Sequence, residues 1–140
     1  MLKGRINRGF TLIELMIVIS IIGVLAGIMV PNFMRARSEA NLSGCESNLK
    51  NISTAIEMYL VRHKTLPSDN MEFLTEDAGG GPCLKSLPKC PSTGTVTYTL
   101  TIDTDNPTMY TVSCGGTNHS GCDIPTDYPC YVAGKGLIEH

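Results

Sequence analysis

The chain has 140 residues, a formal net charge of −2 and six cysteines. This length provides for one small domain, and the sequence contains no internal repeat, which excludes a repeat array. Nucleic acid as the main partner calls for a basic face, and a slightly acidic composition gives it no support; contact with DNA through a local basic patch stays an open alternative.

The first nine residues, MLKGRINRG, carry Lys3, Arg5 and Arg8 and no acidic side chain. They precede an apolar run from Phe10 to Met34. Five positions interrupt this run: Thr11, Glu14, Ser20, Pro31 and Asn32. As a helix the run is roughly 37 Å long, which suffices to cross a hydrocarbon core about 30 Å thick. We therefore expect a membrane-spanning helix over 10–34, with the cationic segment 1–9 on the cytoplasmic side.

All six cysteines follow the apolar run, in the part of the chain that this orientation places across the membrane. Cysteines in a small domain with a thin core predict disulfides in an oxidising compartment. Zinc binding is the competing interpretation, but the sequence has no C-x2-C pair. Six cysteines allow many connectivities, and the arrangement that we expect is Cys90 with Cys114, Cys122 with Cys130, and Cys45 with Cys83.

One carboxylate, Glu14, lies near the start of the apolar run. A charge in the middle of a membrane helix is unfavourable by about 2.5 to 3.5 kcal/mol, so it usually has a partner or a function. One explanation is that Glu14 stays hydrated close to the membrane interface. The other is cleavage between Gly9 and Phe10, which creates an α-ammonium group near Glu14 and thereby supplies the opposite charge.

The sequence GFTLIE at 9–14, followed by the apolar run, resembles the class III signal of type IV prepilins and of the pseudopilins of type II secretion and DNA-uptake machines. The resemblance implies that a prepilin peptidase cleaves after Gly9 and methylates the new amino terminus at Phe10. It also implies that Glu14 meets the terminal amine of a neighbouring subunit during assembly. An ordinary secretory signal, with VLAG at 24–27 as its cleavage site, is the alternative, and Glu14 fits poorly in its apolar region.

Gly23, Gly27 and Pro31 are spaced four residues apart, so they lie on one face of a helix. Small residues at this spacing allow close helix packing in an apolar setting. Pro31 cannot donate a hydrogen bond to the carbonyl of Gly27, which weakens the helix between Gly23 and Pro31. In type IV pili, similarly placed residues bracket a segment that unwinds in the filament, and the resemblance implies the same here.

The helix continues beyond the apolar run, over residues 35–64, as an amphipathic segment. One apolar stripe follows a helical period: Leu42, Cys45, Leu49, Ile52, Ile56 and Tyr59. Pro67 predicts that the helix ends just before it. A short helix is expected at 69–75. Cys45 lies in the stripe, where it is either a small buried hydrophobe or one half of a disulfide to the remaining domain.

Residues 65–140 are expected to form a head of loops and strands. The stretch 78–94 is rich in glycine and proline and predicts a loop. TVTYTLTI at 95–102 alternates apolar and polar residues, and TMYTVSC at 108–114 returns after a turn, which predicts a hairpin that covers the helical stripe. LPKCPSTG, YTVSCGGTNHSG and DYPCY resemble pilin-type heads. The expected fold is α+β, type IV pilin-like: a long helix packed by its distal half on a small antiparallel sheet.

Few side chains in the head suggest a ligand site. Asp103, Asp105 and Asn106 carry oxygens that calcium could use, but the sequence lacks a calcium loop with its central glycine and reads as an ordinary turn. His119 is expected to be a turn residue, and His63 to interact with the helix dipole. No arrangement of nucleophile, base and orienting group is recognisable. We therefore expect no enzyme activity, no metal and no cofactor.

The function that these features predict is structural. The chain is expected to be a pilin stored in the inner membrane and then extracted into an extracellular homopolymeric filament. The partners implied are copies of itself, the prepilin peptidase, an inner-membrane assembly platform and minor pilins. A pseudopilin that stays in the envelope is the alternative, and a membrane-anchored enzyme or binding domain is a third. Adhesion, motility, DNA uptake and secretion all use this type of signal.

Overall fold

The structure is a computed structural model that describes residues 9–67, 71–76, 80–106, 108–115, 119–122 and 124–138. The expected leader, 1–9, therefore lies outside the described residues except for Gly9. The chain divides into two compact units, Met1–Met34 and Arg35–His140. The expected α+β fold is confirmed, because one long helix is followed by a small antiparallel sheet.

The long helix, α1, runs over Leu12–His63 and has 52 residues. Its end agrees with the prediction, and the chain leaves it through Lys64, whose φ of 62° is left-handed and whose amide donates to the carbonyl of Leu60 over 2.8 Å. Pro31 lies inside the helix, and the helical conformation continues on both sides of it. The helix is therefore a single element over the predicted range.

The sheet contains four strands in the order β1-β2-β3-β4, all antiparallel. They are β1 (Tyr98–Ile102), β2 (Tyr110–Cys114), β3 (Cys130–Val132) and β4 (Gly136–Ile138). The predicted hairpin is confirmed, with Leu100 opposite Val112. The first strand begins later than predicted: Val96 precedes it and is 47% exposed instead of facing the core.

The core of Arg35–His140 lies between the helical stripe and the hairpin. Four stripe residues are completely buried: Cys45, Leu49, Ile52 and Ile56. They share one hydrophobic cluster with Tyr98, Leu100, Tyr110, Val112 and Cys114 from β1 and β2. Leu42 and Tyr59, at the two ends of the stripe, are only half-buried. The amphipathic pattern thus identified the face of the helix that packs on the sheet.

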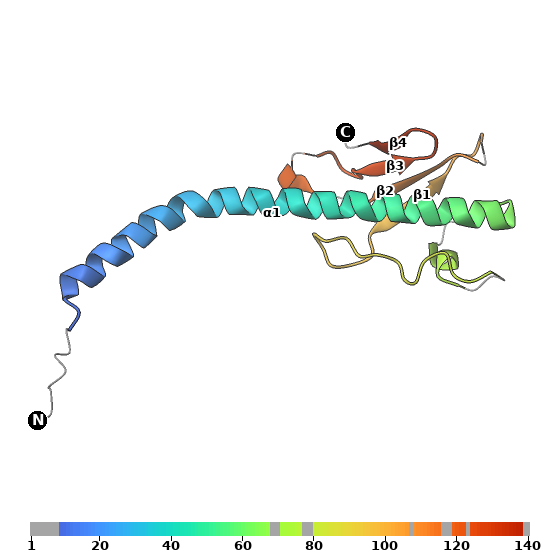
Figure 1. Cartoon of the computed structure of the whole chain (residues 1–140). Helices are drawn as coiled ribbons and strands as arrows, with labels where there is room; N and C mark the ends of the chain where they lie inside the picture. The colour runs from blue at the N-terminus through green and yellow to red at the C-terminus, as the bar shows by residue number, and fades with distance from the viewer. Residues whose placement is uncertain are drawn as a thin grey trace, which may run out of the picture. The chain divides into compact units, whose positions relative to one another are not determined.

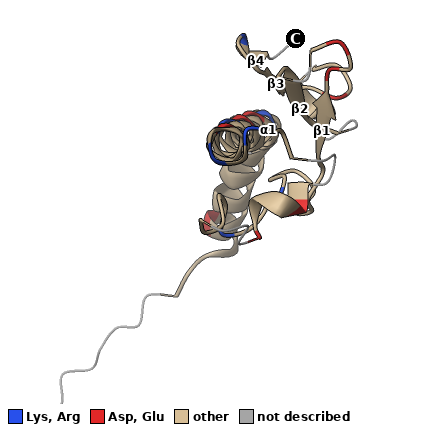
Figure 2. Ribbon diagram, turned by 90° about the vertical axis from the view of Figure 1, so that its right-hand side faces the viewer, with Lys and Arg blue, Asp and Glu red and all other residues tan. Residues whose placement is uncertain are grey.

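Two short helices lie in the described part of the head. They are η1 (Met71–Leu74), inside the segment 69–75 where a helix was expected, and η2 (Ser120–Cys122). Both are single 3-10 turns. In the view of Figure 1 the sheet is drawn above α1 and the segment that carries η1 below it. Seen along the helix in Figure 2, the sheet and this segment lie to the same side of α1, and no described segment covers its other flank.

Polar contacts fix the head on the helix. The Asn48 side-chain amide donates to the carbonyl of Lys89 and to the hydroxyl of Tyr98, both over 3.0 Å. On β2, the Tyr110 hydroxyl donates to the carbonyl of Ser53 over 3.2 Å. The bonds that Tyr98 and Tyr110 make are half-buried and buried, so satisfying these polar groups fixes the orientation of the head on the helix in addition to the apolar packing.

Candidate functional site

The amino-terminal end of α1 is closed by a reciprocal cap between Thr11 and Glu14. The Thr11 amide and hydroxyl donate to Oε2 of Glu14 over 2.9 and 2.8 Å, and the Glu14 amide donates to the Thr11 hydroxyl over 3.3 Å. This is the capping-box arrangement, in which two amides at the helix start find side-chain acceptors. Glu14 therefore already has a local structural role before any second chain is considered.

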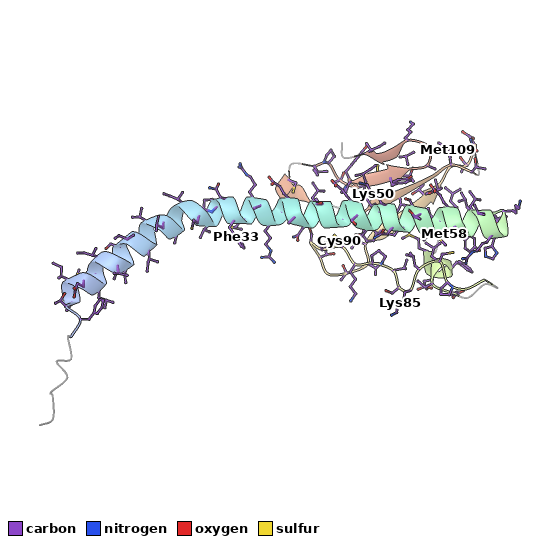
Figure 3. All side chains as sticks on the ribbon, viewed as in Figure 1. Phe33, Lys50, Met58, Lys85, Cys90 and Met109 are labelled. Carbon is purple, nitrogen blue, oxygen red and sulfur yellow. The ribbon has the colours of Figure 1, made fainter. Side chains whose placement is uncertain are left out.

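The apolar surface of α1 has no cover within its own unit. Every large apolar side chain from Phe10 to Met34 is between 45% and 79% exposed. Figure 3 shows side chains, Phe33 among them, projecting outward from this part of the helix. Among the described residues, α1 is the one helix long and apolar enough to cross a membrane. An apolar surface of this extent indicates contact with lipid or with other protein chains.

The predicted weak segment lies within this uncovered surface. Gly23 and Gly27 have no heavy atom within 4 Å of the position where a Cβ would lie. Their lack of a side chain is therefore not required by packing inside the chain. Pro31 is helical, so the unwinding that the resemblance implies is not a feature of the isolated chain.

Of the three predicted cysteine pairs, the structure brings together Cys90 and Cys114, and a third cysteine, Cys45, lies beside them. No disulfide bond joins any two of the six cysteines, all of which lie within the described residues. The Sγ atoms of Cys90 and Cys114 are 3.7 Å apart, and Cys45 belongs to the same cluster. A hydrogen bond with Cys114 and burial raise the pKa of the Cys45 thiol, so it is protonated at neutral pH.

Cys83 is not near Cys45, its predicted partner. Its Sγ lies 3.9 Å from Nη1 of Arg62 in the last turn of α1. Arg62 and Cys45 are separated by roughly 25 Å along the helix, at 1.5 Å per residue. The pairing of Cys45 with Cys83 therefore does not fit this structure. Cys45 lies near the start of the packed half of the helix, whereas Cys83 contacts its last turn.

The other predicted pair is Cys122 with Cys130. Cys122 is half-buried in η2 and Cys130 is buried at the start of β3. Burial raises the pKa of both thiols, and the carboxylate of Glu39 adds to the effect at Cys122. Both side chains are thus thiols at neutral pH in this structure, and their pairing remains a prediction.

His119 is a candidate functional residue whose surroundings the sequence pattern did not indicate. It lies in a turn, as expected, but it is only 4% exposed. Its Nε2 is 3.7 Å from Sγ of Cys90 and 3.5 Å from Sγ of Cys114. On the other side of the ring, Nδ1 is 3.3 Å from the hydroxyl of Ser92. Figure 3 places Cys90 in the loop that runs beside α1.

The remaining predicted sites have structural roles. Asp103 Oδ1 accepts the amide of Asp105 over 2.9 Å, and Asn106 Oδ1 accepts the Thr108 hydroxyl over 2.7 Å. These bonds stabilise the turn between β1 and β2, as ordinary turn chemistry does. At the end of α1, the ring of His63 lies 4.3 Å from that of Tyr59.

Comparison with known proteins places these features in a family. The Prokaryotic N-terminal methylation motif matches residues 4–30. The chain is 32% identical over 109 residues to the type IV narrow pilus major component PilA5 of Thermus thermophilus, an alignment that covers 78% of this chain and 89% of that protein. No solved structure matches the chain.

Two further relatives match over shorter stretches. The type IV major pilin protein PilA of Myxococcus xanthus is 55% identical over 49 residues, which cover 35% of this chain and 22% of the relative. The type II secretion system core protein G of Pseudomonas aeruginosa is 33% identical over 90 residues, which cover 63% of each. The chain thus spans less than two thirds of either relative. From the motif, the fold and the near-complete match to the Thermus pilin, the chain belongs to the family of type IV pilins and pseudopilins.

Proposed function

We propose that the chain is a structural subunit of a type IV pilus. It is made with the leader 1–9, cleaved by a prepilin peptidase between Gly9 and Phe10, and methylated on Phe10. The observation that carries this proposal is the uncovered apolar surface of α1 from Phe10 to Met34, joined to a head that has its own core. Such a chain is incomplete alone, because the free energy of burying that surface is available only in lipid or among neighbouring helices.

The two environments define the two states of the subunit. Before assembly, the apolar half of α1 lies in the inner membrane with the head on the non-cytoplasmic side. In the filament, the same surfaces bury one another and the heads form the outside. The partners of the chain are then copies of itself, an inner-membrane assembly platform and minor pilins. The subunit does no chemistry of its own.

Glu14 has two roles in this proposal, and the cap geometry makes them separable. Within the chain, its Oε2 caps the helix through Thr11. Between chains, its negative charge pairs with the methylated amine of a neighbouring Phe10 and sets the register of docking. Glutamine at this position keeps an oxygen that can accept from Thr11 and loses the charge.

The test compares Glu14→Gln with Glu14→Ala in cells that express the full chain. We expect both variants to be cleaved and to accumulate in the membrane, and both to yield few or no filaments in the sheared surface fraction. Normal filament yield from Glu14→Gln contradicts the docking role and leaves Glu14 as a helix cap. The Thr11→Val variant, which removes the hydroxyl and keeps the charge, is the matched control for loss of the cap.

A second candidate function, that of a pseudopilin in a type II secretion system, is favoured by the 90-residue match to core protein G. The mass of the amino-terminal peptide, measured in both the sheared and the membrane fractions, separates the two. A peptide that begins at methylated Phe10 in sheared filaments supports the pilin. The same peptide confined to the envelope supports the pseudopilin, and a chain that begins at Met1 contradicts both.

A further inference from the structure

Four side chains that can bind metal ions converge inside the head. The Sγ atoms of Cys45, Cys90 and Cys114 and a ring nitrogen of His119 all lie within 4.8 Å of one another, and all four residues are buried. They come from α1, from the loop before β1, from the end of β2 and from the turn that leads into η2. Nothing in the proposed filament function requires this cluster.

The distances among Cys90, Cys114 and His119 match those of a tetrahedral zinc site, and Cys45 lies within 4.8 Å of all three. With Zn–S bonds of about 2.3 Å and a Zn–N bond of about 2.0 to 2.1 Å, tetrahedral angles place two sulfurs about 3.8 Å apart and a sulfur and a nitrogen about 3.6 Å apart. In the structure, Cys90 Sγ and Cys114 Sγ are separated by 3.7 Å. The distances from His119 Nε2 to these two sulfurs are 3.7 and 3.5 Å.

Neighbouring hydroxyl groups orient these side chains. Ser92 Oγ lies 3.3 Å from Nδ1 of His119, so the other nitrogen, Nε2, faces the sulfurs. Thr97 Oγ1 lies 3.7 Å from Sγ of Cys114, and the Tyr98 hydroxyl is hydrogen-bonded to Cys45. Polar groups that hold the ligands from behind are a regular part of protein metal sites, because they fix the tautomer and the orientation of each ligand.

We propose that the head binds one Zn²⁺ ion through Cys45, Cys90, Cys114 and His119. Binding replaces the three thiol protons by one metal ion and leaves the imidazole neutral, so three protons go to solvent and the occupied site has a net charge of −1. Thiolate and imidazole ligands in a tetrahedral arrangement select zinc over calcium or magnesium, which prefer oxygen. Four protein ligands leave no open position, so the site is structural and not catalytic.

A disulfide between Cys90 and Cys114 is the competing state of the same residues. It explains the contact of two side chains but leaves a third cysteine and a buried histidine beside the bond with no role. A zinc ion uses all four. The two states also differ in composition, because the disulfide removes two hydrogen atoms from the chain and the zinc site contains a metal.

The experiment uses the full chain, purified in detergent from the membranes of cells grown with zinc, without chelator or reductant. We expect about one zinc per chain by elemental mass spectrometry, and zinc at background in Cys114→Ser. Cys83→Ser is the matched control, because Cys83 lies outside the cluster, and it keeps the metal. Zinc at background in the wild-type chain, zinc retained in Cys114→Ser, or an intact Cys90 to Cys114 disulfide each overturns the proposal.

A second measurement does not depend on a variant that folds. The wild-type chain is freed of metal with a chelator and titrated with Co²⁺ alone, which takes the place of zinc in such sites. We expect intense thiolate-to-cobalt charge-transfer absorption that saturates at one Co²⁺ per chain and disappears when Zn²⁺ is added. Absorption typical of cobalt bound only to oxygen or nitrogen, or no saturable absorption, contradicts a site built from three cysteines.

Discussion

The packing of the distal half of α1 on the sheet is tested most directly at Leu49. This side chain is 0% exposed and belongs to the cluster that joins α1 to β1 and β2. Leu49→Ala removes buried methyl groups without lowering helix propensity, since alanine is the best helix former. Any loss of stability therefore measures the packing between helix and head and not the helix itself.

The expected loss is about 3 kcal/mol, within the range of roughly 2 to 5 kcal/mol for leucine to alanine at a fully buried site. Part of this is lost transfer free energy and part is the cavity that the rigid sheet cannot close. For a unit of this size, each kcal/mol lowers Tm by about 4 to 8 °C, so the midpoint should fall by about 12 to 24 °C.

Near-ultraviolet circular dichroism of tyrosine, measured on the full chain in detergent micelles, follows the unfolding of the head. All five tyrosines lie between Tyr59 and Tyr131, so the apolar half of α1 does not contribute to the signal. Val61→Ala is the control, because Val61 lies on the same helix and is 76% exposed. If Leu49→Ala shifts the midpoint no more than Val61→Ala does, the stripe does not form the interface described above.

Three further changes probe other contacts. Burial and the nearby carboxylate of Glu57 raise the pKa of Tyr110 in the folded chain. The neutral Tyr110 hydroxyl therefore stabilises the fold fully below the ordinary tyrosine pKa of about 10, and this contribution is lost as the pH rises above that value. Above about pH 10, the free energy of unfolding should fall less steeply with pH in Tyr110→Phe than in the wild-type chain. Pro31→Ala restores an amide donor inside α1, and hydrogen exchange should slow around that position. In Gly115→Ala, the new Cβ lies 3.0 Å from the carbonyl oxygen of Thr97, and denaturant unfolding should show a loss of about 1 kcal/mol or more.

The helix and the hairpin could be predicted because each has a long, regular period. The stripe along α1 and the alternation from Tyr98 to Ile102 set both the elements and the faces that meet. Val96 was assigned to the strand because alternation alone does not show where hydrogen bonding to the partner strand starts. The strands β3 and β4 have three residues each, too few for a period, and their pairing depends on the rest of the sheet.

The two candidate sites differed in how much the sequence revealed. The features of the amino-terminal segment are local: GFTLIE lies in one stretch, and even the cap between Thr11 and Glu14 could have been predicted from the T-x-x-E spacing. The cluster around His119 is not local. Its four members come from separate segments of the chain. The missing C-x2-C pairs argued against zinc, but this criterion detects only zinc sites whose ligands are close in sequence.

The small size of the head favours a cross-link at this position. After α1 the chain has 77 residues, a length at which a hydrophobic core alone contributes little and a disulfide or a metal usually adds to it. A disulfide between Cys90 and Cys114 joins the loop to β2 and leaves α1 held by packing and hydrogen bonds, with no cross-link to the head. A zinc ion that also binds Cys45 and His119 ties α1, the loop, β2 and the η2 turn to one point, at the end of the stripe nearest the apolar half of the helix. The two cross-links therefore make opposite predictions for the head: a zinc site loses stability with a chelator under non-reducing conditions, whereas a disulfide loses it only with a reductant.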